Sequence, residues 1–501
     1  MLVSDYAAEG KSLARVDGKV IFIEQAVPGD VVDIQLLKSK KDWAEGRPLH
    51  FHSYSAERVT PFCSHFGVCG GCQWQMLPYE KQLLFKQKQV ADNLQRIGKI
   101  ELPEMMPIAG ADETKYYRNK LEYTFGTKEF TKEKPQPPQT PPKEGLRNAQ
   151  SQFEEDSLIT TKNSNNIKES SSVPPLGGRG ASFCGFHARG WFDKVVDLKT
   201  CYLQAEPTNV IRLAIKDFAK KHDYTFYDIR NHHGLLRTMQ VRLCSTGELM
   251  VNIVFGENAK SKIDKLLEFV ANEFPEITTL LYTINTKMND SLHDLQPIVY
   301  TGKGYAIEKL ATGNGDESFQ FKIGPKSFFQ TNTKQAEKLY QITRDFAELS
   351  GKETVYDLYC GTGSIGIFVS KLAKKVIGVE LIAAAIDDAN ENAALNNLSH
   401  TSFFAGDVID ICDDAFFASH GRPDVIITDP PRAGMHEKLS RKILEMNAPI
   451  VVYVSCNPAT QARDLAILSE KYLVTKIQPV DMFPHTHHIE NVVQLKLRQE
   501  V

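Results

Sequence analysis

The residues of this sequence with the clearest chemical potential stand at the ends of predicted strands. A β-branched run at 450–454 leads to Cys456, and Asp429 ends a second apolar run. The segment 485–490, His-Thr-His-His-Ile-Glu, precedes the last predicted strand. A strand-end thiol is more often an inert core residue than a nucleophile. Beside a carboxylate and a His-rich loop ending in Glu490, it can instead be the nucleophile of a site that also holds a polar anchor and a base.

A second chemical group is a compact run of cysteines, Cys63, Cys69 and Cys72. Two glycines between them let the chain wrap tightly around an inorganic centre. Three thiolates need a fourth ligand, for which Cys201 is the first choice and Cys184 the second. Four thiolates suit an iron–sulfur cluster or zinc. Zinc sites more often show two separated C-x-x-C pairs, so the triplet favours the cluster.

A glycine-rich turn after a predicted strand at 354–358 indicates a nucleoside-type ligand. Gly361 and Gly363 let a ligand approach the backbone, and Glu380 ends the next strand at the offset where an acidic side chain meets ribose hydroxyls. The turn is not a G-x-G-x-x-G followed by a phosphate-binding lysine, which disfavours a pyrophosphate. S-adenosylmethionine, which has a ribose and no phosphate, fits better. Asp407 follows a third strand and is placed to accept the adenine amine.

These groups need a sheet that brings strand ends to one edge. From residue 351 onward, strands alternate with helices in a doubly wound, Rossmann-like α/β pattern, and ligands of such sheets bind outside the carboxyl ends of the strands. Residues 1–55 predict a small β-barrel of the oligonucleotide-binding (OB) type. The fold prediction is therefore a multidomain β and α/β protein with domains at 1–55 (OB-like barrel), 56–325 (α+β, with the cysteine run) and 326–501 (methyltransferase type).

Two segments stand apart from these domains. Residues 129–181 are dominated by Pro, Gln, Ser, Asn, Lys and Glu and predict a disordered insertion within a sheet. Residues 80–97 repeat apolar positions at helical spacing and predict a surface helix that ends at Gly98.

The composition limits the classes of partner. The formal net charge of −3 gives no global basic field, so any contact with RNA must rest on local patches. One such patch groups Trp43 with Lys38, Lys40, Lys41 and Arg47, and it is as compatible with a solvated hairpin as with RNA. No apolar run is long enough to span a membrane, and no signal peptide opens the sequence, so a cytoplasmic monomer is expected.

Taken together, these motifs resemble the RNA uracil-C5 methyltransferase family, whose members make 5-methyluridine in 23S ribosomal RNA and tRNA. The resemblance covers nearly the whole chain except the insertion. It rests on the cysteine triplet, Phe329-Gln330-Thr331-Asn332, the glycine turn, Asp429-Pro430-Pro431-Arg432, Ser455-Cys456-Asn457-Pro458 and the closing segment 485–490. With its leading barrel and cysteine run, the chain looks like the branch that acts on 23S ribosomal RNA, and the tRNA branch is the alternative.

The resemblance implies an N-terminal barrel of TRAM type, a [4Fe-4S] cluster and an S-adenosylmethionine-dependent C-terminal domain. It implies Cys456 as nucleophile and Glu490 as base, with His485, His487 and His488 as nearby competitors for the base. Phe328 and Asp429 would contact the uracil. The implied cofactor contacts are Gln330, Tyr359, Ser364, Glu380, Asp407 and Asp429, and the implied cluster ligands are Cys63, Cys69, Cys72 and Cys201.

The implied chemistry is covalent, because uracil C5 is too weak a nucleophile to take a methyl group unaided. Addition of a thiolate to C6 makes C5 reactive, and an electropositive surrounding would help Cys456 to ionise. Two rival functions remain open to the sequence. One is an amino-methyltransferase that uses the D-P-P-R strand end, which leaves Cys456 and Glu490 without a role. The other is a non-catalytic RNA-binding or redox-sensing protein that carries the cluster.

Overall fold

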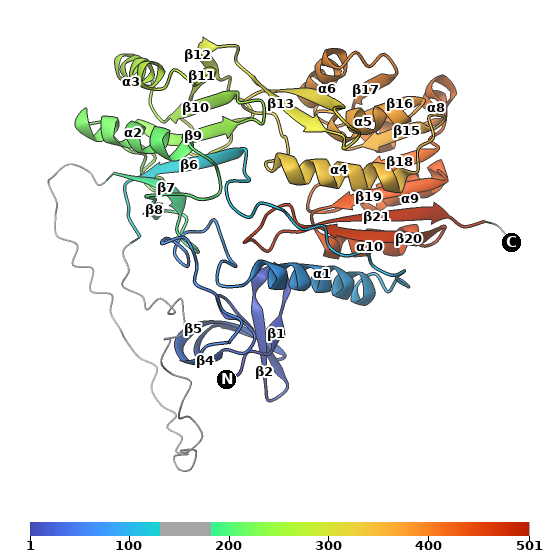
Figure 1. Ribbon diagram of the computed structural model, residues 1–501, viewed down its shortest axis with the longest axis horizontal. Coiled ribbons are helices and arrows are strands. Elements are labelled where there is room, and N and C mark those ends of the chain that lie inside the picture. Colours follow the sequence, from blue (N-terminus) through green and yellow to red (C-terminus); the bar gives the residue numbers. More distant parts are fainter. Residues whose placement is uncertain (131–181, 500–501) are drawn as a thin grey trace.

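The computed structural model describes residues 1–130 and 182–499, which build three sheet-based bodies (Figure 1). Nearly all of the predicted insertion, residues 131–181, lies outside the described residues. The strands before and after this segment, at 120–126 and 183–187, pair with each other in antiparallel fashion, with Phe125 opposite Cys184. Within the described residues, no helix is long and apolar enough to cross a membrane.

The N-terminal body is a strongly bent sheet with the strand order β1-β2-β3-β5-β4. A bridge between Leu2 and Val31 joins its two ends, so the sheet closes on itself around a small core that includes Ala14 and Ile23. The predicted N-terminal β-structure is confirmed. The strands are β1 (Asp5–Tyr6), β2 (Ser12–Val16), β3 (Lys19–Ile23), β4 (Val31–Ser39) and β5 (Trp43–Ser53), with a 3₁₀ turn, η1 (Ala8–Gly10), after β1.

The central body is a mixed sheet with the order β12-β11-β10-β9-β6-β7-β8. Helices α2 (Thr208–Lys221) and α3 (Lys260–Glu273) pack side by side on it and share one hydrophobic cluster with its strands. Only β10 and β11 pair in parallel, because α3 forms the crossover between them. The strands are β6 (Lys120–Gly126), β7 (Phe183–His187), β8 (Val195–Asp197), β9 (Leu236–Leu243), β10 (Leu249–Phe255), β11 (Thr279–Ile284) and β12 (Ile298–Gly302).

The C-terminal body is a doubly wound sheet with the order β17-β16-β15-β18-β19-β21-β20. The five strands from β17 to β19 are parallel, whereas β21 is antiparallel to both of its neighbours. The strands are β15 (Thr354–Leu358), β16 (Lys375–Glu380), β17 (Thr401–Ala405), β18 (Val425–Thr428), β19 (Ile450–Ser455), β20 (Tyr472–Val480) and β21 (Glu490–Leu497). The predicted Rossmann-like arrangement is thus present, with β20 and β21 added at one edge.

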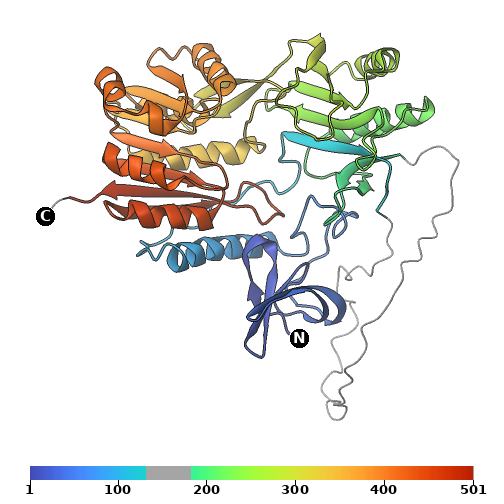
Figure 2. The ribbon, with the colours of Figure 1, turned by 180° about the vertical axis from the view of Figure 1, so that it is seen from behind.

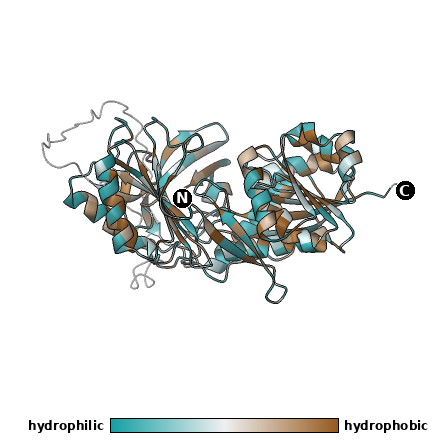
Figure 3. Ribbon diagram, turned by 90° about the horizontal axis from the view of Figure 1, so that it is seen from above, coloured by the Kyte–Doolittle hydropathy of each residue, from teal (hydrophilic) through white to brown (hydrophobic). Residues whose placement is uncertain are grey.

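Helices cover both faces of this sheet, and seen from above, apolar residues line its strands while the helices carry polar residues outside (Figure 3). A hairpin of β13 (Ala306–Ala311) and β14 (Ser318–Ile323) packs into the same core through Leu310 and Phe321. The helices are α4 (Thr333–Ala347), α5 (Ser364–Val369), α6 (Ala383–Leu395), α7 (Val408–Ile411), α8 (Asp414–His420), α9 (Glu437–Met446) and α10 (Pro458–Leu468), with a 3₁₀ turn, η2 (Ser370–Leu372), after α5.

The helix predicted on the surface is instead buried along one side. Helix α1 (Tyr79–Arg96) lies between the barrel and the C-terminal sheet and packs against α10 (Figures 1 and 2). Its buried stripe is Gln82, Lys86, Val90 and Leu94, spaced four residues apart. Two members of that stripe are polar, so hydrophobicity alone does not mark it as the packed side. Those two residues find their partners in the loop before β21.

Lys86 of α1 forms a fully buried ion pair with Asp481 of that loop. Its Nζ lies 2.6 Å from Asp481 Oδ1, and both side chains have 0% exposure. The Tyr79 hydroxyl donates to the other carboxylate oxygen at 2.7 Å. Breaking such a pair on one side leaves a buried charge without a counter-charge. The pair therefore ties α1 to the C-terminal body.

We expect Lys86→Met to reduce the free energy of unfolding by about 3–5 kcal/mol, because Asp481 loses its counter-charge. The double variant Lys86→Met/Asp481→Asn should recover much of that loss, since both charges are then absent. Urea unfolding followed by circular dichroism measures the difference. A single variant as stable as the double variant would show that the ion pair does not hold α1.

Candidate active site

Two strands of opposite direction bring the predicted nucleophile and base together. In the β19–β21 register, Ser455 pairs with Asn491, so the next residues along, Cys456 and Glu490, stand at the same sheet edge. Strand β18 runs parallel to β19 and therefore ends at the same sheet edge. Asp429 directly follows β18, so it lies at that edge as well. The three residues predicted from separate parts of the sequence therefore lie close together. Both carboxylates raise the pKa of the Cys456 thiol.

The surroundings of the Cys456 thiol disfavour its ionisation. Burial, followed by the nearby Glu490 and Asp429 carboxylates, raises the pKa of Cys456 to about 11, while Arg432 opposes them. The resting thiol is therefore protonated at neutral pH. Its ionisation must accompany the arrival of the substrate, and Arg432 is the cation beside it that favours the thiolate.

Arg432 ends the D-P-P-R motif, and its contacts become clear only in the structure. The structure fixes its backbone to the start of α10, where its carbonyl accepts from Asn457 Nδ2 at 3.0 Å and from Thr460 Oγ1 at 3.2 Å. Its guanidinium bonds the ring of His488. Arg432 therefore links the loop after β18, the nucleophile's helix and the loop before β21.

The histidines near Glu490 are poor candidates for the base. Burial lowers the pKa of His485 and of His487 to about 4, and that of His488 to about 3. Burial and the neighbouring Asp429 instead raise the pKa of Glu490 well above its usual range. A general base works best with a pKa near the working pH, so the environment favours Glu490 over the three rings.

The glycine-rich turn after β15 is open enough for a ligand to meet its backbone. Tyr359 has φ = +61° and Gly363 has φ = +77°, so the chain doubles back before α5. The Glu380 carboxylate accepts from the Gly361 N–H at 3.3 Å and from the Ile382 N–H at 3.0 Å. Asp407 caps α7 by accepting from the Ile409 N–H at 2.9 Å. Each acidic residue is held by one or two backbone donors at the strand edge.

The remaining predicted contacts lie on or near α4 and α5. Ser364 opens α5 and shares a hydrogen bond of 3.0 Å with the hydroxyl of Tyr340, a residue that the sequence did not single out. Gln330 is buried, and its backbone carbonyl accepts a hydrogen bond from Asn119 Nδ2 at 3.0 Å. Phe328 is 73% exposed, which suits a residue that stacks on a base brought from solution.

Buried carboxylates accumulate at this edge. Burial raises the pKa of Asp357 and of Asp429 to about 7, and Asp429 and Glu380 add to the shift of Asp357. Asp357 Oδ2 accepts from the Gly366 N–H at 2.8 Å, which only partly offsets its burial. A site with this excess of acid favours a cationic ligand, and the sulfonium of S-adenosylmethionine carries such a charge.

The predicted cluster ligands line one pocket. Its wall contains Cys63, Cys69, Cys72 and Cys201 together with Phe62, Phe66 and Leu198. Burial raises the pKa of Cys69 and Cys201 to about 12 and that of Cys72 to about 11. Cys184, the second choice for the fourth ligand, lies in β7 outside this wall. Within the described residues, no three Cys, His, Asp or Glu side chains are arranged to hold a single metal ion.

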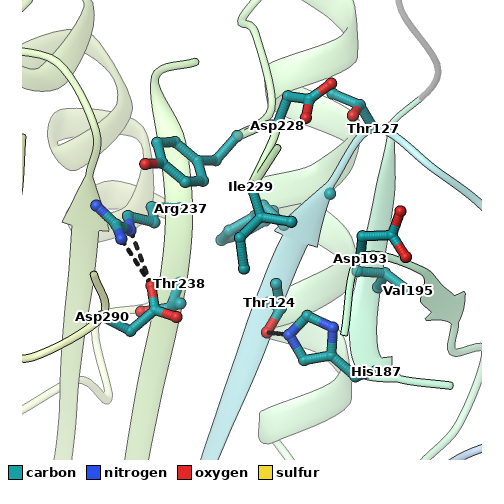
Figure 4. A pocket seen from close by; sticks show the side chains of 13 residues that line it. Thr124, Thr127, His187, Asp193, Val195, Asp228, Ile229, Arg237, Thr238 and Asp290 are labelled. Carbon is teal, nitrogen blue, oxygen red and sulfur yellow. Dashed lines mark hydrogen bonds and ion pairs between the residues drawn. The ribbon is translucent and has the colours of Figure 1, made fainter. Parts of the chain in front are cut away.

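A further cavity lies in the central body, at the far end of β6 from the active site (Figure 4). His187 shares a hydrogen bond of 3.4 Å with Thr124, and its Nδ1 and Asp193 Oδ1 find no partner among the described residues. The cavity volume is about 30 Å³, enough for one or two water molecules.

Comparison with known proteins gives the family of the chain. The model of the tRNA (uracil-5-)-methyltransferase family matches residues 296–405 and 416–498, and the TRAM domain matches residues 1–49. An uncharacterized RNA methyltransferase of Bacteroides thetaiotaomicron is 48% identical over 98% of this chain and 100% of its own length. A second one, from Porphyromonas gingivalis, is 46% identical over 99% of both chains.

Among solved structures, the fold is similar to the crystal structure of the Pyrococcus abyssi tRNA (uracil-54, C5)-methyltransferase in complex with S-adenosyl-L-homocysteine. The TM-score is 0.69 and the identity 25%, over 99% of both chains. Fold and site together define an RNA methyltransferase that uses S-adenosylmethionine. More narrowly, the chain belongs to the RNA uracil-C5 methyltransferase family.

We expect S-adenosylmethionine binding to release about one proton per chain near pH 7, because the sulfonium stabilises the ionised forms of Asp357 and Asp429 and lowers their pKa values from about 7. Titration calorimetry in two buffers of different ionisation enthalpy measures the release. S-adenosylhomocysteine, which lacks the positive charge, should release fewer protons. Equal binding heats in both buffers would contradict the charge argument.

Proposed function

We propose that this protein methylates C5 of a uracil in RNA through a transient bond between Cys456 Sγ and C6 of the ring. The observation that carries the proposal is the β19–β21 register, which sets a half-buried thiol beside a buried carboxylate at the cofactor edge of the sheet. A strand-end thiol with no catalytic task would not need Glu490, Asp429 and Arg432 around it. Mapping 5-methyluridine, described below, tests the proposal.

Each residue then has a task in the reaction. Cys456 gives up its proton and adds to C6, which moves the ring electrons toward C5 and O4. S-adenosylmethionine, when bound, supplies an electrophilic methyl group. Once C5 carries the methyl group, Glu490 removes the remaining C5 proton. The electrons of that C–H bond restore the C5–C6 double bond, and the C6–S bond breaks to return Cys456 as a thiolate.

The base must leave the RNA stack to reach Cys456, since C6 is shielded inside a helix. In this proposal, the exposed Phe328 stacks on the extruded uracil and Asp429 holds its polar edge or the cofactor amine. The acidic edge of the sheet suits a sulfonium cofactor. The residues that would hold that cofactor are Gln330, Tyr359, Ser364, Glu380, Asp407 and Asp429.

The target RNA is the part of the proposal with two candidates. A leading barrel and a cysteine run predict 23S ribosomal RNA. The Pyrococcus abyssi structure, however, aligns over 99% of both chains, and its enzyme acts on uracil 54 of tRNA. A fold shared over nearly the whole chain therefore does not distinguish an enzyme for ribosomal RNA from one for tRNA. 23S ribosomal RNA stays a prediction.

Mapping 5-methyluridine in ribosomal RNA and tRNA from cells with and without this protein separates the two substrates. Loss of one modified site in 23S ribosomal RNA is expected, and loss of a tRNA site would select the alternative. A methylated amino group in place of 5-methyluridine would overturn the reaction itself. Unchanged RNA would favour a non-catalytic role.

We expect Cys456→Ala to abolish both turnover and the covalent RNA adduct while S-adenosylmethionine still binds, because the thiol acts on the base and not on the cofactor. Denaturing gels of protein mixed with RNA, together with calorimetry, measure the two properties. Cys412→Ala is a matched control, since Cys412 is buried in a separate part of the same body. A Cys456→Ala variant with normal activity would remove the nucleophile assignment.

We also propose that Cys63, Cys69, Cys72 and Cys201 hold a [4Fe-4S] cluster. All four thiols line one pocket whose wall is largely apolar, and four thiolates are the ligand set of such a cluster. Phe62 and Phe66 in the pocket wall would shield the cluster from solvent. We assign the cluster a structural role in the N-terminal half of the chain.

Protein purified without oxygen should contain about four iron and four sulfide per chain, the content of a four-thiolate cubic cluster. Cys201→Ser should lower both values because it removes one ligand. Cys184→Ser should leave them unchanged, because Cys184 lies outside the pocket wall. Elemental analysis and the visible absorption spectrum measure the content, and stoichiometric zinc without iron would contradict the cluster.

A further inference from the structure

The loop that delivers the candidate base is buried although it has no regular structure. Residues 481–489 connect β20 to β21 and end at Glu490, and most of their side chains are buried. Backbone groups in such a loop need partners, because water does not reach them. The structure supplies these partners from distant parts of the chain.

Every carbonyl from residue 481 to residue 485 accepts a hydrogen bond from another segment. Two donors belong to the start of α4 and its cap, and the others come from residues before 120. In order along the loop, the donors are Gln335 Nε2 (2.7 Å), Asn332 Nδ2 (2.9 Å), Lys86 Nζ (3.2 Å), the Tyr117 hydroxyl (2.9 Å), and the N–H groups of Gln73 and Trp74 (2.8 and 3.0 Å). The carbonyls of residues 483–485 are thus each held by a donor from the N-terminal half of the chain.

Gln82 of α1 contacts this loop at both the backbone and the ring of His485. Its Oε1 accepts from the His485 N–H at 2.9 Å, and its Nε2 lies 3.1 Å from His485 Nδ1. The same Nε2 donates to the carbonyls of Trp74 and Leu77 at 3.0 Å. Gln82 has 0% exposure, so water cannot replace these bonds. One amide therefore joins α1, the end of the cysteine run and the loop.

His485 needs this support because of its backbone conformation. Its φ is +64°, the left-handed region that non-glycine residues adopt only when their surroundings hold them there. Its carbonyl and N–H are both bonded to residues 73–82, and the Phe62 ring packs edge-on against its imidazole at 5.1 Å. The turn at His485 directs the chain toward Glu490.

Beyond His485, the loop is held by hydrogen bonds of Thr486 to the Phe483 carbonyl and by burial of Ile489. His488 bonds Arg432, which also lies beside Cys456. A shift of about 1 Å in a group that transfers a proton can cost about 100-fold in rate. The strand register pairs Glu490 with Val480 of β20, and the turn held at residues 484–485 sets how the chain enters that register. The position of Glu490 relative to Cys456 therefore depends on both.

We propose that Gln82 and Tyr117 are positioning residues for Glu490, acting from the N-terminal half of the chain through His485 and Pro484. This inference rests on the proposed roles of Cys456 and Glu490. Neither residue touches the reacting atoms. Their loss would impair removal of the C5 proton more than the earlier formation of the covalent bond, since Cys456 is anchored on β19 and α10 instead.

The test uses the full-length protein and S-adenosylmethionine labelled in the methyl group. The RNA substrate is isolated from cells that lack this protein, so its target uridine is unmodified. Gln82→Leu keeps the side-chain volume and removes the bonds to His485, and Tyr117→Phe removes one hydroxyl. The matched controls are Gln89→Leu on the same helix and Tyr116→Phe, whose side chains make no hydrogen bond among the described residues. Turnover, melting temperature and labelled covalent adduct on denaturing gels are measured for each variant.

We expect turnover to fall about 10–100-fold in Gln82→Leu, with a smaller fall in Tyr117→Phe. Methylated RNA adduct should accumulate in both, whereas the KM for S-adenosylmethionine stays within about twofold and both controls behave as wild type. A merely structural role would instead lower adduct and turnover in parallel. That outcome, or wild-type turnover in both variants, overturns the inference.

Glu490→Gln serves as the reference, because it should trap the same adduct by removing the base. Adduct in Glu490→Gln but in neither Gln82→Leu nor Tyr117→Phe would reject the positioning role and leave the proposed function intact. No adduct even in Glu490→Gln would reject the base assignment on which both rest. Should Gln82→Leu fail to fold, Tyr117→Phe decides alone, since it removes a single oxygen.

Discussion

The reversed direction of β21 is the constraint on which the rest of this active site depends. A parallel sheet brings only the carboxyl ends of its strands to one edge, and so Cys456 and Asp429 reach that edge by the usual rule. Glu490 reaches it as the first residue of a strand, because β21 is antiparallel to β19. In a wholly parallel sheet, the same residue would lie at the opposite edge from the thiol.

This geometry has an electrostatic cost that a ligand can relieve. Asp357, Asp429 and Glu490 are buried at one edge, and burial raises the pKa of each. Burial, together with Asp429 and Glu490, raises the pKa of the Cys456 thiol and keeps it protonated at neutral pH. A cationic cofactor would favour the ionised carboxylates, and Arg432 would favour the thiolate. The resting site is therefore poorly reactive, which fits an enzyme whose nucleophile should act only on a bound base.

The N-terminal half of the chain contributes to this edge without supplying any of the reacting groups. Helix α1 places a buried lysine and a buried glutamine against the loop before β21. The end of the cysteine run bonds the same loop at His485. The three bodies in Figure 1 are thus joined at the loop that carries the base, rather than linked as independent modules.

Much of the fold and most of the candidate site follow from the sequence, because they are encoded locally. Strand-end motifs such as Asp429-Pro430-Pro431-Arg432 and Cys456-Asn457-Pro458, the glycine turn and the spacing of the cysteines each combine a chemical group with the element that positions it. The doubly wound pattern then implies a common edge. The sequence also marked Glu490, although only by its place at the end of a His-rich segment.

Tertiary structure alone decided what depends on residues far apart in the chain. Gln82 and Lys86 look like polar positions of a surface helix, yet they are buried because their partners, His485 and Asp481, lie about 400 residues away. The low pKa of the histidines and the high pKa of the Cys456 thiol likewise come from burial and from neighbours on other strands. Local sequence patterns specify which groups are present, but the packing of distant segments sets their charge and their distance from one another.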